Sequence, residues 1–204
     1  MTILVFALLA YLLGSVSFAV VSSWIFKLPD PRTYGSRNPG ATNVLRSGRK
    51  AAAVLTLLGD AGKGWLAVVL AQTYAPLWGL GNEGIAVAAL AVFLGHVFPV
   101  FLRFQGGKGV ATAVGVLLGL NPWVGLMAIA TWLLVALIWR ISSLSALVAA
   151  ALTPVYTVIM IGLEGSTLAV LLMSLVLIWR HQSNIVNLLA GKEGRIGAER
   201  TPGA

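Results

Sequence analysis

The chain has 204 residues, of which 58% are hydrophobic and 10% charged, with a net charge of +8 and no cysteine. A soluble domain carries about 25% charged residues, so this composition indicates a membrane protein, and its long apolar runs predict helices rather than a barrel. The lack of cysteine excludes disulfides, thiol chemistry and Cys–His metal sites, and on a membrane protein the basic charge points to anionic lipid before nucleic acid.

Seven apolar segments follow one another, and they predict an all-α polytopic membrane bundle of about seven spans in a single domain, 1–204. The segments are 2–26, 51–74, 84–102, 110–120, 123–139, 144–163 and 166–179. A crossing helix needs about 20 residues, so the fourth and seventh segments are short. The fourth is a candidate for a partial or re-entrant helix shielded by protein. We expect residues 192–204 to form a flexible tail.

The first loop is dense in small polar residues and reads GSRNPGATN at 35–43, followed by Arg46. Glycine permits tight backbone geometry in which amide N–H groups point at an anion. Arg46 can bind a phosphate through two hydrogen bonds. A loop whose basic residues served only to orient the protein in the membrane would not need so many small polar residues. The loop is therefore a candidate phosphate site. Its candidate binding residues are Ser36, Asn38, Thr42, Asn43 and Arg46.

The second apolar segment contains Asp60 and Lys63, which lie one helical turn apart and therefore share roughly one helix face. Ionisable groups at membrane depth are costly and usually face the interior of the bundle. Two interpretations stay open at this point. The pair is either a polar wall of a site or pathway, or a structural ion pair that locks helix packing.

A second glycine-rich segment comes just before the fourth apolar segment, where Lys108 stands among Gly106, Gly107 and Gly109. Backbone amides and a helix N-terminus both favour phosphate there, although the spacing is not that of a P-loop. His96, near the end of the preceding segment, could carry a proton or donate to an oxyanion. A lone histidine is more often a structural hydrogen-bonding group.

Two more polar groups follow in the fifth loop and after the seventh segment. Ser143 is either a helix cap or a site residue. His181 and Asn184 are three residues apart and share a face if the helix continues through them. Both histidines, the two glycine loops and the basic residues are therefore predicted to converge on one side of the membrane.

The distribution of charge gives that side. Thirteen of the fourteen lysines and arginines fall in the first, third and fifth loops and the C-terminal tail, whereas the second, fourth and sixth loops contain none. The positive-inside rule makes the basic loops cytoplasmic. The expected topology has the N-terminus outside and the C-terminus inside, in the cell (inner or plasma) membrane.

The order and spacing of these blocks strongly resemble the bacterial acyl-phosphate:glycerol-3-phosphate acyltransferases, membrane enzymes that make lysophosphatidic acid. The resemblance runs from residue 11 to residue 191 and is carried by 14–15, 35–43 with 46, 60–64, 95–99, 106–112, 142–145, and 181 with 184–185. The chain departs from the usual pattern at Arg37, which stands at a glycine position, and at three usually basic positions. Those three are Gln105, Gln182 and Asn187.

The resemblance implies transfer of a fatty acyl group from acyl phosphate to the 1-hydroxyl of glycerol 3-phosphate, with phosphate released and no cofactor or metal required. Lys108 and the surrounding glycine amides are expected to bind one phosphate and the developing oxyanion. Either the substrate's own phosphate or a histidine takes the hydroxyl proton. The residues expected to hold glycerol 3-phosphate are Arg46, Ser36 and Asn43, and those expected to orient its hydroxyl are Ser143, His181 and Asn184, or His96. Expected partners are the two substrates and membrane lipid, with the enzyme a monomer.

The main alternative is a membrane transporter of a phosphorylated solute. A transporter would place polar residues through several spans, whereas only the second segment carries charge. An alcohol phosphotransferase would need an acidic metal-binding cluster, which six scattered acids do not form. A purely structural membrane component would leave the glycine-rich loops unexplained.

Overall fold

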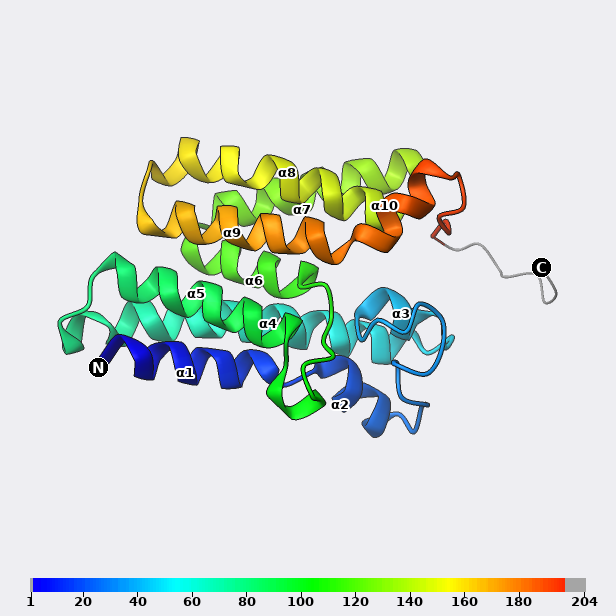
Figure 1. Cartoon of the computed structure of the whole chain (residues 1–204), viewed down its shortest axis with the longest axis horizontal. Helices are drawn as coiled ribbons and strands as arrows, with labels where there is room; N and C mark the ends of the chain where they lie inside the picture. Colours follow the sequence, from blue (N-terminus) through cyan, green and yellow to red (C-terminus); the bar gives the residue numbers. More distant parts are fainter. Residues whose placement is uncertain (1, 197–204) are drawn as a thin grey trace.

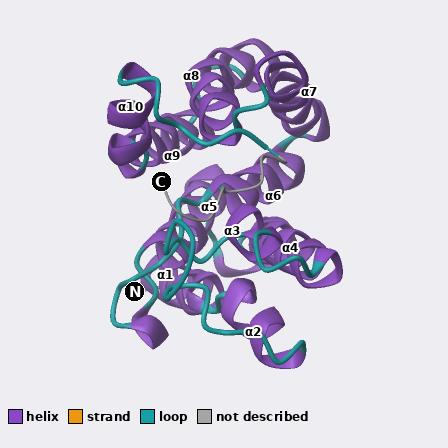
Figure 2. Ribbon diagram, turned by 90° about the vertical axis from the view of Figure 1, so that its right-hand side faces the viewer, coloured by secondary structure: helices purple, strands orange, loops and turns teal. Residues whose placement is uncertain are grey.

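The computed structural model describes residues 2–196, and this part of the chain folds into helices and loops without a strand. The elements are α1 (Thr2–Ser15), α2 (Phe18–Ile25), α3 (Ala41–Leu45), α4 (Lys50–Tyr74), η1 (Pro76–Trp78), α5 (Asn82–Val97), η2 (Val100–Leu102), α6 (Val110–Leu120), α7 (Pro122–Trp139), α8 (Ser142–Ile161), α9 (Gly165–Arg180) and α10 (Gln182–Leu189). The predicted all-α fold is confirmed. The long helices run side by side, with α1, α4 and α5 on one side, α7, α8 and α9 on the other, and α6 between α4 and α7 (Figures 1 and 2).

Five helical stretches are long and apolar enough to cross a membrane: Thr2–Ile25, Lys50–Tyr74, Asn82–Leu102, Pro122–Trp139 and Ser142–Ile161. Helices α9 and α10 make a sixth if the pair, bent by 56°, is counted as one span. Helix α6, with 11 residues, is shorter than a crossing helix. The described chain thus has five or six candidate spans, and the expected seven spans and the orientation of the termini stay predictions.

The first predicted span is broken, because α1 ends at Ser15 and α2 begins at Phe18. Lys63 Nζ on α4 donates to Val16 O at 2.6 Å, and Phe18 N donates to Asp60 Oδ1 at 3.3 Å. Lys63 and Asp60 also form an ion pair of 2.7 Å. The pair satisfies backbone groups that the break removes from the helix, which matters where water is scarce. These contacts favour the structural interpretation of the pair over a polar pathway.

Glycines allow the closest helix contacts in the bundle. A side chain at Gly64 of α4 would overlap Thr112 O of α6, and one at Gly115 of α6 would overlap Ala61 O of α4. Small residues at such crossings let helix backbones pack closely in a membrane protein. Helix α6 is therefore covered by α4 on one side and α7 on the other, as a helix too short to cross requires.

The predicted break at Asn121 and Pro122 is confirmed. Helix α6 ends at Leu120, and Asn121 Oδ1 accepts a hydrogen bond from Trp123 N at 2.9 Å to cap α7. Proline suits the first position of α7 because the amide it lacks would have no partner there. Cap and proline together fix the corner between α6 and α7.

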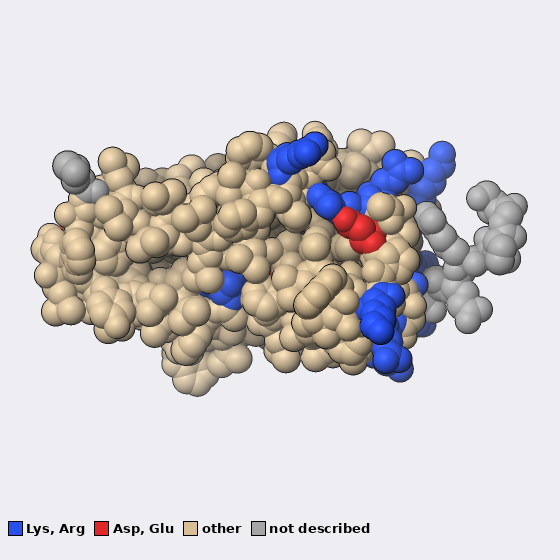
Figure 3. Space-filling model, turned by 90° about the horizontal axis from the view of Figure 1, so that it is seen from below, with Lys and Arg blue, Asp and Glu red and all other residues tan. Residues whose placement is uncertain are grey.

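The polar loops lie toward one end of the bundle. Helix α1 begins at the opposite end of the molecule from α3 and α10 (Figure 1). On the face seen in Figure 3, most lysine and arginine side chains gather toward the end that carries those two helices. The clustering of the predicted basic loops in space therefore agrees with their alternation along the sequence.

Candidate active site

Four polar side chains from separate segments meet near the start of α6. Lys108 Nζ donates a hydrogen bond to Asn184 Oδ1 on α10. Asn184 Nδ2 donates to Glu193 Oε1 at 2.6 Å, and Ser143 Oγ at the start of α8 donates to the same carboxylate oxygen at 2.8 Å. The structure thus brings together three predicted site residues, Lys108, Ser143 and Asn184, and adds Glu193, which sequence reasoning missed.

Lys108 lies in a partly buried, electropositive environment. Burial lowers the pKa of its ammonium group to about 8, and the positive charges of Arg180 and Arg46 act in the same direction while Glu193 opposes them. Burial disfavours the charged form, and a nearby anion restores it. The loop around Lys108 is therefore prepared to bind a negatively charged group.

Arg180, at the end of α9, supports the glycine loop. Its Nη2 donates to Gly106 O at 3.1 Å, and its guanidinium carbon lies 6.0 Å from the Phe98 ring centroid and 5.8 Å from that of Trp179. These contacts hold the guanidinium beside the loop through a hydrogen bond and cation–π attraction. Sequence reasoning counted Arg180 only as an orientation charge, although its position directly before His181 was a usable signal.

His181 occupies the bend between α9 and α10 and is 3% exposed. Its Nδ1 lies 2.8 Å from Leu177 O. A carbonyl oxygen only accepts hydrogen bonds, so this contact requires a hydrogen on Nδ1 and leaves Nε2 with a lone pair in the neutral ring. The predicted shared face of His181 and Asn184 requires a helix that continues through both residues. The chain instead bends by 56° between α9 and α10.

The three glycines of the Lys108 loop are required by close contacts. Gly109 has φ +89° at the start of α6, and a side chain there would overlap the Phe93 ring. Gly106 and Gly107 lie against His96, and Gly107 N donates to His96 O at 3.2 Å. The end of α5 therefore anchors the loop. The first amides of α6 have no carbonyl of a preceding turn to bond, so they are available to an anion.

Asn43 shapes the first loop from within. Its side chain is 2% exposed; Oδ1 accepts from Ser36 N at 2.9 Å, and Nδ2 donates to Pro31 O at 2.7 Å and to Tyr34 O at 3.2 Å. These bonds use both ends of the amide. Because the amide is committed to loop backbone, the structure favours a positioning role for Asn43, and its direct contact with glycerol 3-phosphate stays a prediction.

The other predicted residues of the first loop are more open. Thr42 Oγ1 lies 3.4 Å from Ser142 Oγ at the start of α8. The first loop thus reaches across to the helix that carries part of the Lys108 cluster. Ser36, Thr42 and Arg46 are exposed, and Asn38 is half-buried.

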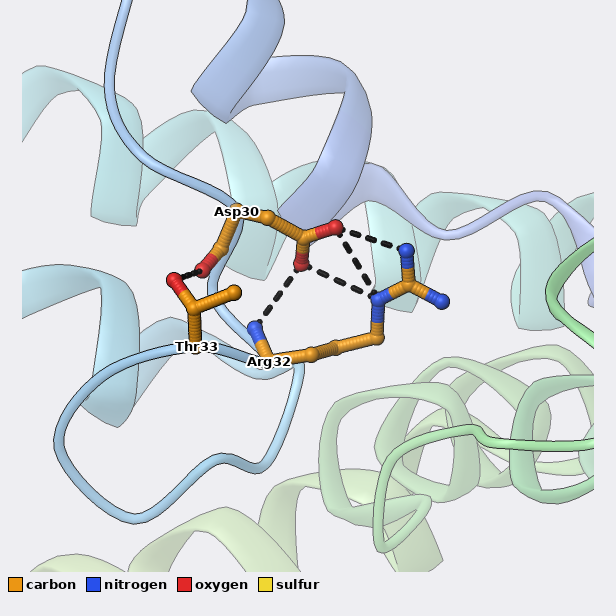
Figure 4. Close-up of polar contacts among 3 residues, drawn as sticks. All are labelled: Asp30, Arg32 and Thr33. Carbon is orange, nitrogen blue, oxygen red and sulfur yellow. Dashed lines mark hydrogen bonds and ion pairs between the residues drawn. The ribbon is translucent and has the colours of Figure 1, made fainter.

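An internal ion pair stiffens the chain just before this loop (Figure 4). The Asp30 carboxylate accepts from Arg32 N at 2.9 Å and from Arg32 Nη2 at 2.6 Å, and Thr33 Oγ1 donates to Asp30 O at 2.8 Å. The hydrogen bond from the Arg32 side chain lowers the pKa of Asp30. Arg32 is therefore engaged within its own turn.

A narrow apolar groove lies between α6, α7, α8 and α9. Val110, two residues after Lys108, lines it, as do Ala146 and Thr153, which share a face of α8 with Ser143. Leu177, whose carbonyl binds His181, also lines it. The polar cluster therefore stands at the head of the groove.

Comparison with known proteins identifies the family of this chain. The model of the glycerol-3-phosphate acyltransferase family matches residues 4–191. The glycerol-3-phosphate acyltransferase of Nitrosospira multiformis is 66% identical over 201 residues, covering 98% of this chain and 100% of that protein. That of Ralstonia nicotianae is 61% identical over 198 residues, covering 97% and 96%.

Two solved structures share the fold. The crystal structure of PlsY (YgiH), an integral membrane glycerol 3-phosphate acyltransferase, in its glycerol 3-phosphate form has a TM-score of 0.88 and 34% identity, covering 97% of this chain and 96% of that chain. Its lysophosphatidic acid form has a TM-score of 0.87 at the same identity and coverage. As the sequence resemblance implied, this chain belongs to the glycerol-3-phosphate acyltransferase family of integral membrane enzymes.

Proposed function

We propose that the Lys108 cluster is the active site at which this enzyme moves a fatty acyl group from acyl phosphate to the 1-hydroxyl of glycerol 3-phosphate. As a member of its family, the protein acylates glycerol 3-phosphate; the donor and the residues are what we add. The observation that carries the proposal is a cationic, hydrogen-bonding cluster at the head of an apolar groove. The two substrates together carry one fatty acyl chain and two phosphate groups, so they need an apolar groove next to cationic, hydrogen-bonding side chains.

The donor is the one that the family resemblance implies, and its chemistry suits the site. In acyl phosphate the carbonyl carbon already bears a good leaving group. The hydroxyl oxygen attacks this carbon, the bond from carbon to the phosphate oxygen breaks, and lysophosphatidic acid and phosphate result. Lys108 and the amides at the start of α6 stabilise the negative charge on the phosphate and the oxyanion. The acyl chain lies along the groove that begins at Val110.

The first loop holds the acceptor. Arg46 and Ser36 are exposed at the mouth of the site, where they bind the phosphate of glycerol 3-phosphate, while Asn43 keeps the loop in shape. Ser143 and Asn184 orient the hydroxyl. Glu193 holds both of those side chains through one carboxylate oxygen and supplies a countercharge to Lys108.

The hydroxyl proton has two candidate acceptors, the substrate's own phosphate and His181. The ring of His96 is enclosed between Asp60 and Gly107, and this enclosure disfavours contact with substrate. The lone pair on Nε2 of His181 makes it the better placed histidine. Replacement of His181 by alanine separates the two: a modest loss of activity supports the substrate phosphate, and loss to background with binding intact supports the histidine.

The placement in the membrane follows from charge. We infer that the basic end of the bundle faces the cytoplasm of a bacterial inner membrane. Helix α1 begins at the opposite end of the molecule from α10 in Figure 1, which suits an odd number of crossings. Seven crossings result if α6 counts as a short span and α9 with α10 as one. The four clustered side chains all come from one chain, which supports a monomer as the active form.

A direct assay tests the reaction. The purified enzyme is given glycerol 3-phosphate with acyl phosphate, acyl-coenzyme A or acyl-carrier protein, and both phosphate and lysophosphatidic acid are measured. We expect turnover only when acyl phosphate is the donor, with phosphate and lysophosphatidic acid formed in equal amounts. Turnover only with a thioester would overturn the proposed donor.

A further inference from the structure

A buried polar network connects the break in the first span to the Lys108 loop. At its centre, Asp60 on α4 has a side chain 2% exposed and pairs with Lys63, whose side chain is 1% exposed. Both residues also bind the backbone at the α1–α2 break. Asp60 is therefore fixed in position by the ion pair within α4 and by the amide of Phe18 at the start of α2.

His96 continues this network toward the active site. Its Nδ1 lies 3.4 Å from Asp60 Oδ1, a long contact without a hydrogen bond of normal geometry. On the opposite edge of the ring, Nε2 lies against Gly107, where an added Cβ would overlap it. The carbonyl of His96 also accepts from Gly107 N. One residue thus touches Asp60 on one side and the phosphate loop on the other.

The residue after Gly107 is Lys108. A displacement of Gly107 moves Lys108 and the neighbouring amides together, because no flexible segment separates them. A misplacement of about 1 Å in a site of this kind can reduce the rate roughly a hundredfold. Control over the position of Gly107 is therefore control over the phosphate contacts.

We propose that Asp60 and His96 are positioning residues for the Gly106–Gly109 loop. Lys63 and the backbone of the α1–α2 break hold Asp60, Asp60 borders the imidazole, and the imidazole sets the position of Gly107. The inference rests on the proposed phosphate-binding role of this loop.

Two other roles fit the geometry less well. A catalytic base must reach the substrate, whereas the ring of His96 is enclosed between Asp60 and Gly107. A role in stability alone does not require charge, because a buried ion pair is often no more stabilising than well-packed apolar residues. Positioning accounts for both the burial and the contact with the loop.

The test compares variants along the network. They are His96→Ala, His96→Gln, the double variant Asp60→Asn with Lys63→Met, and Lys108→Ala. The matched control is Thr56→Val, because Thr56 on α4 is also fully buried and binds Ser22 of α2 at 2.6 Å without touching His96. For each protein, kcat and KM for both substrates, the pH profile and the thermal midpoint in detergent are measured.

We expect His96→Ala and the double variant to reduce kcat/KM for one phosphate substrate roughly tenfold or more, with the larger part of the change in KM because the loop binds the phosphate. Lys108→Ala should affect the KM of the same substrate. His96→Gln, which keeps a polar atom near Gly107, should recover part of the loss, and Thr56→Val should lower the thermal midpoint without changing either KM. If His96→Ala does not fold, His96→Gln and the double variant carry the test.

Two results would overturn the inference. Network variants that behave like Thr56→Val would make the network merely structural. A collapse of kcat at unchanged KM, with loss of one limb of the pH profile in His96→Gln, would make His96 a base. If Lys108→Ala itself leaves both KM values unchanged, the proposed role of the loop fails instead, so the two failures are distinguishable.

Discussion

The pKa of Lys108 leads to a prediction about the pH dependence of the free enzyme. Burial places that pKa at about 8, below the ordinary 10.5. If the protonated ammonium binds the phosphate, the competent fraction is about 90% at pH 7, about 50% at pH 8 and about 10% at pH 9. We therefore expect kcat/KM to fall about tenfold between pH 7 and pH 9, because kcat/KM reports groups of the free enzyme.

Initial rates of phosphate release from pH 6 to 10, at substrate concentrations below KM, measure this fall in kcat/KM, which is the alkaline limb of the pH profile. Lys108→Arg is the informative variant, since a guanidinium stays charged over the whole range. It should lower activity through altered geometry but abolish the alkaline limb. A limb that persists unchanged in Lys108→Arg, or a wild-type profile flat to pH 10, would refute the assignment to Lys108.

Four further outcomes are expected. Arg37 has φ +57°, a backbone conformation that favours glycine, so Arg37→Gly should raise stability by about 0.5–1 kcal/mol in a detergent melt, and an unchanged or lower midpoint would contradict this. Glu193→Ala removes the acceptor of two hydrogen bonds and should cost roughly 10- to 30-fold in kcat/KM, with Glu193→Gln costing less; equal losses would point to charge alone. Gly109→Ala should destabilise the fold by more than about 1 kcal/mol, because φ is positive there and the new methyl group would overlap the Phe93 ring. The added change Phe93→Leu should restore part of the lost stability; no restoration would mean that backbone strain alone causes the loss. Ala149→Phe narrows the groove and should reduce kcat/KM for long acyl donors more than for short ones, and an equal effect on all donors would argue against the groove as the acyl site.

Much of the fold could be predicted from sequence because its causes are local. The apolar runs gave helices close to the expected bounds, and Asn121 with Pro122 marked the corner between α6 and α7 through their own side chains. The break between α1 and α2 could not be predicted in this way. Its stabilising partners, Asp60 and Lys63, come from α4, more than 40 residues away along the chain.

The site likewise has features that could be predicted from local sequence and features that depend on tertiary packing. Its residue types were visible in the sequence, since glycine loops, Lys108, Ser143 and Asn184 carry the hydrogen-bonding groups that a phosphate needs. An asparagine looks the same in sequence whether its amide faces a ligand or the chain itself, and only the packed loop turns Asn43 inward.

Sequence alone therefore determined the class of protein and the chemistry of its loops, because hydropathy and side-chain type belong to each residue. The tertiary structure decided which groups touch. It joined Glu193 to Ser143 and Asn184, placed Arg180 beside Gly106, and enclosed His96 behind the loop. The physical reason is that hydrogen bonds and ion pairs act over a few ångströms, and only helix packing brings these distant segments within that range.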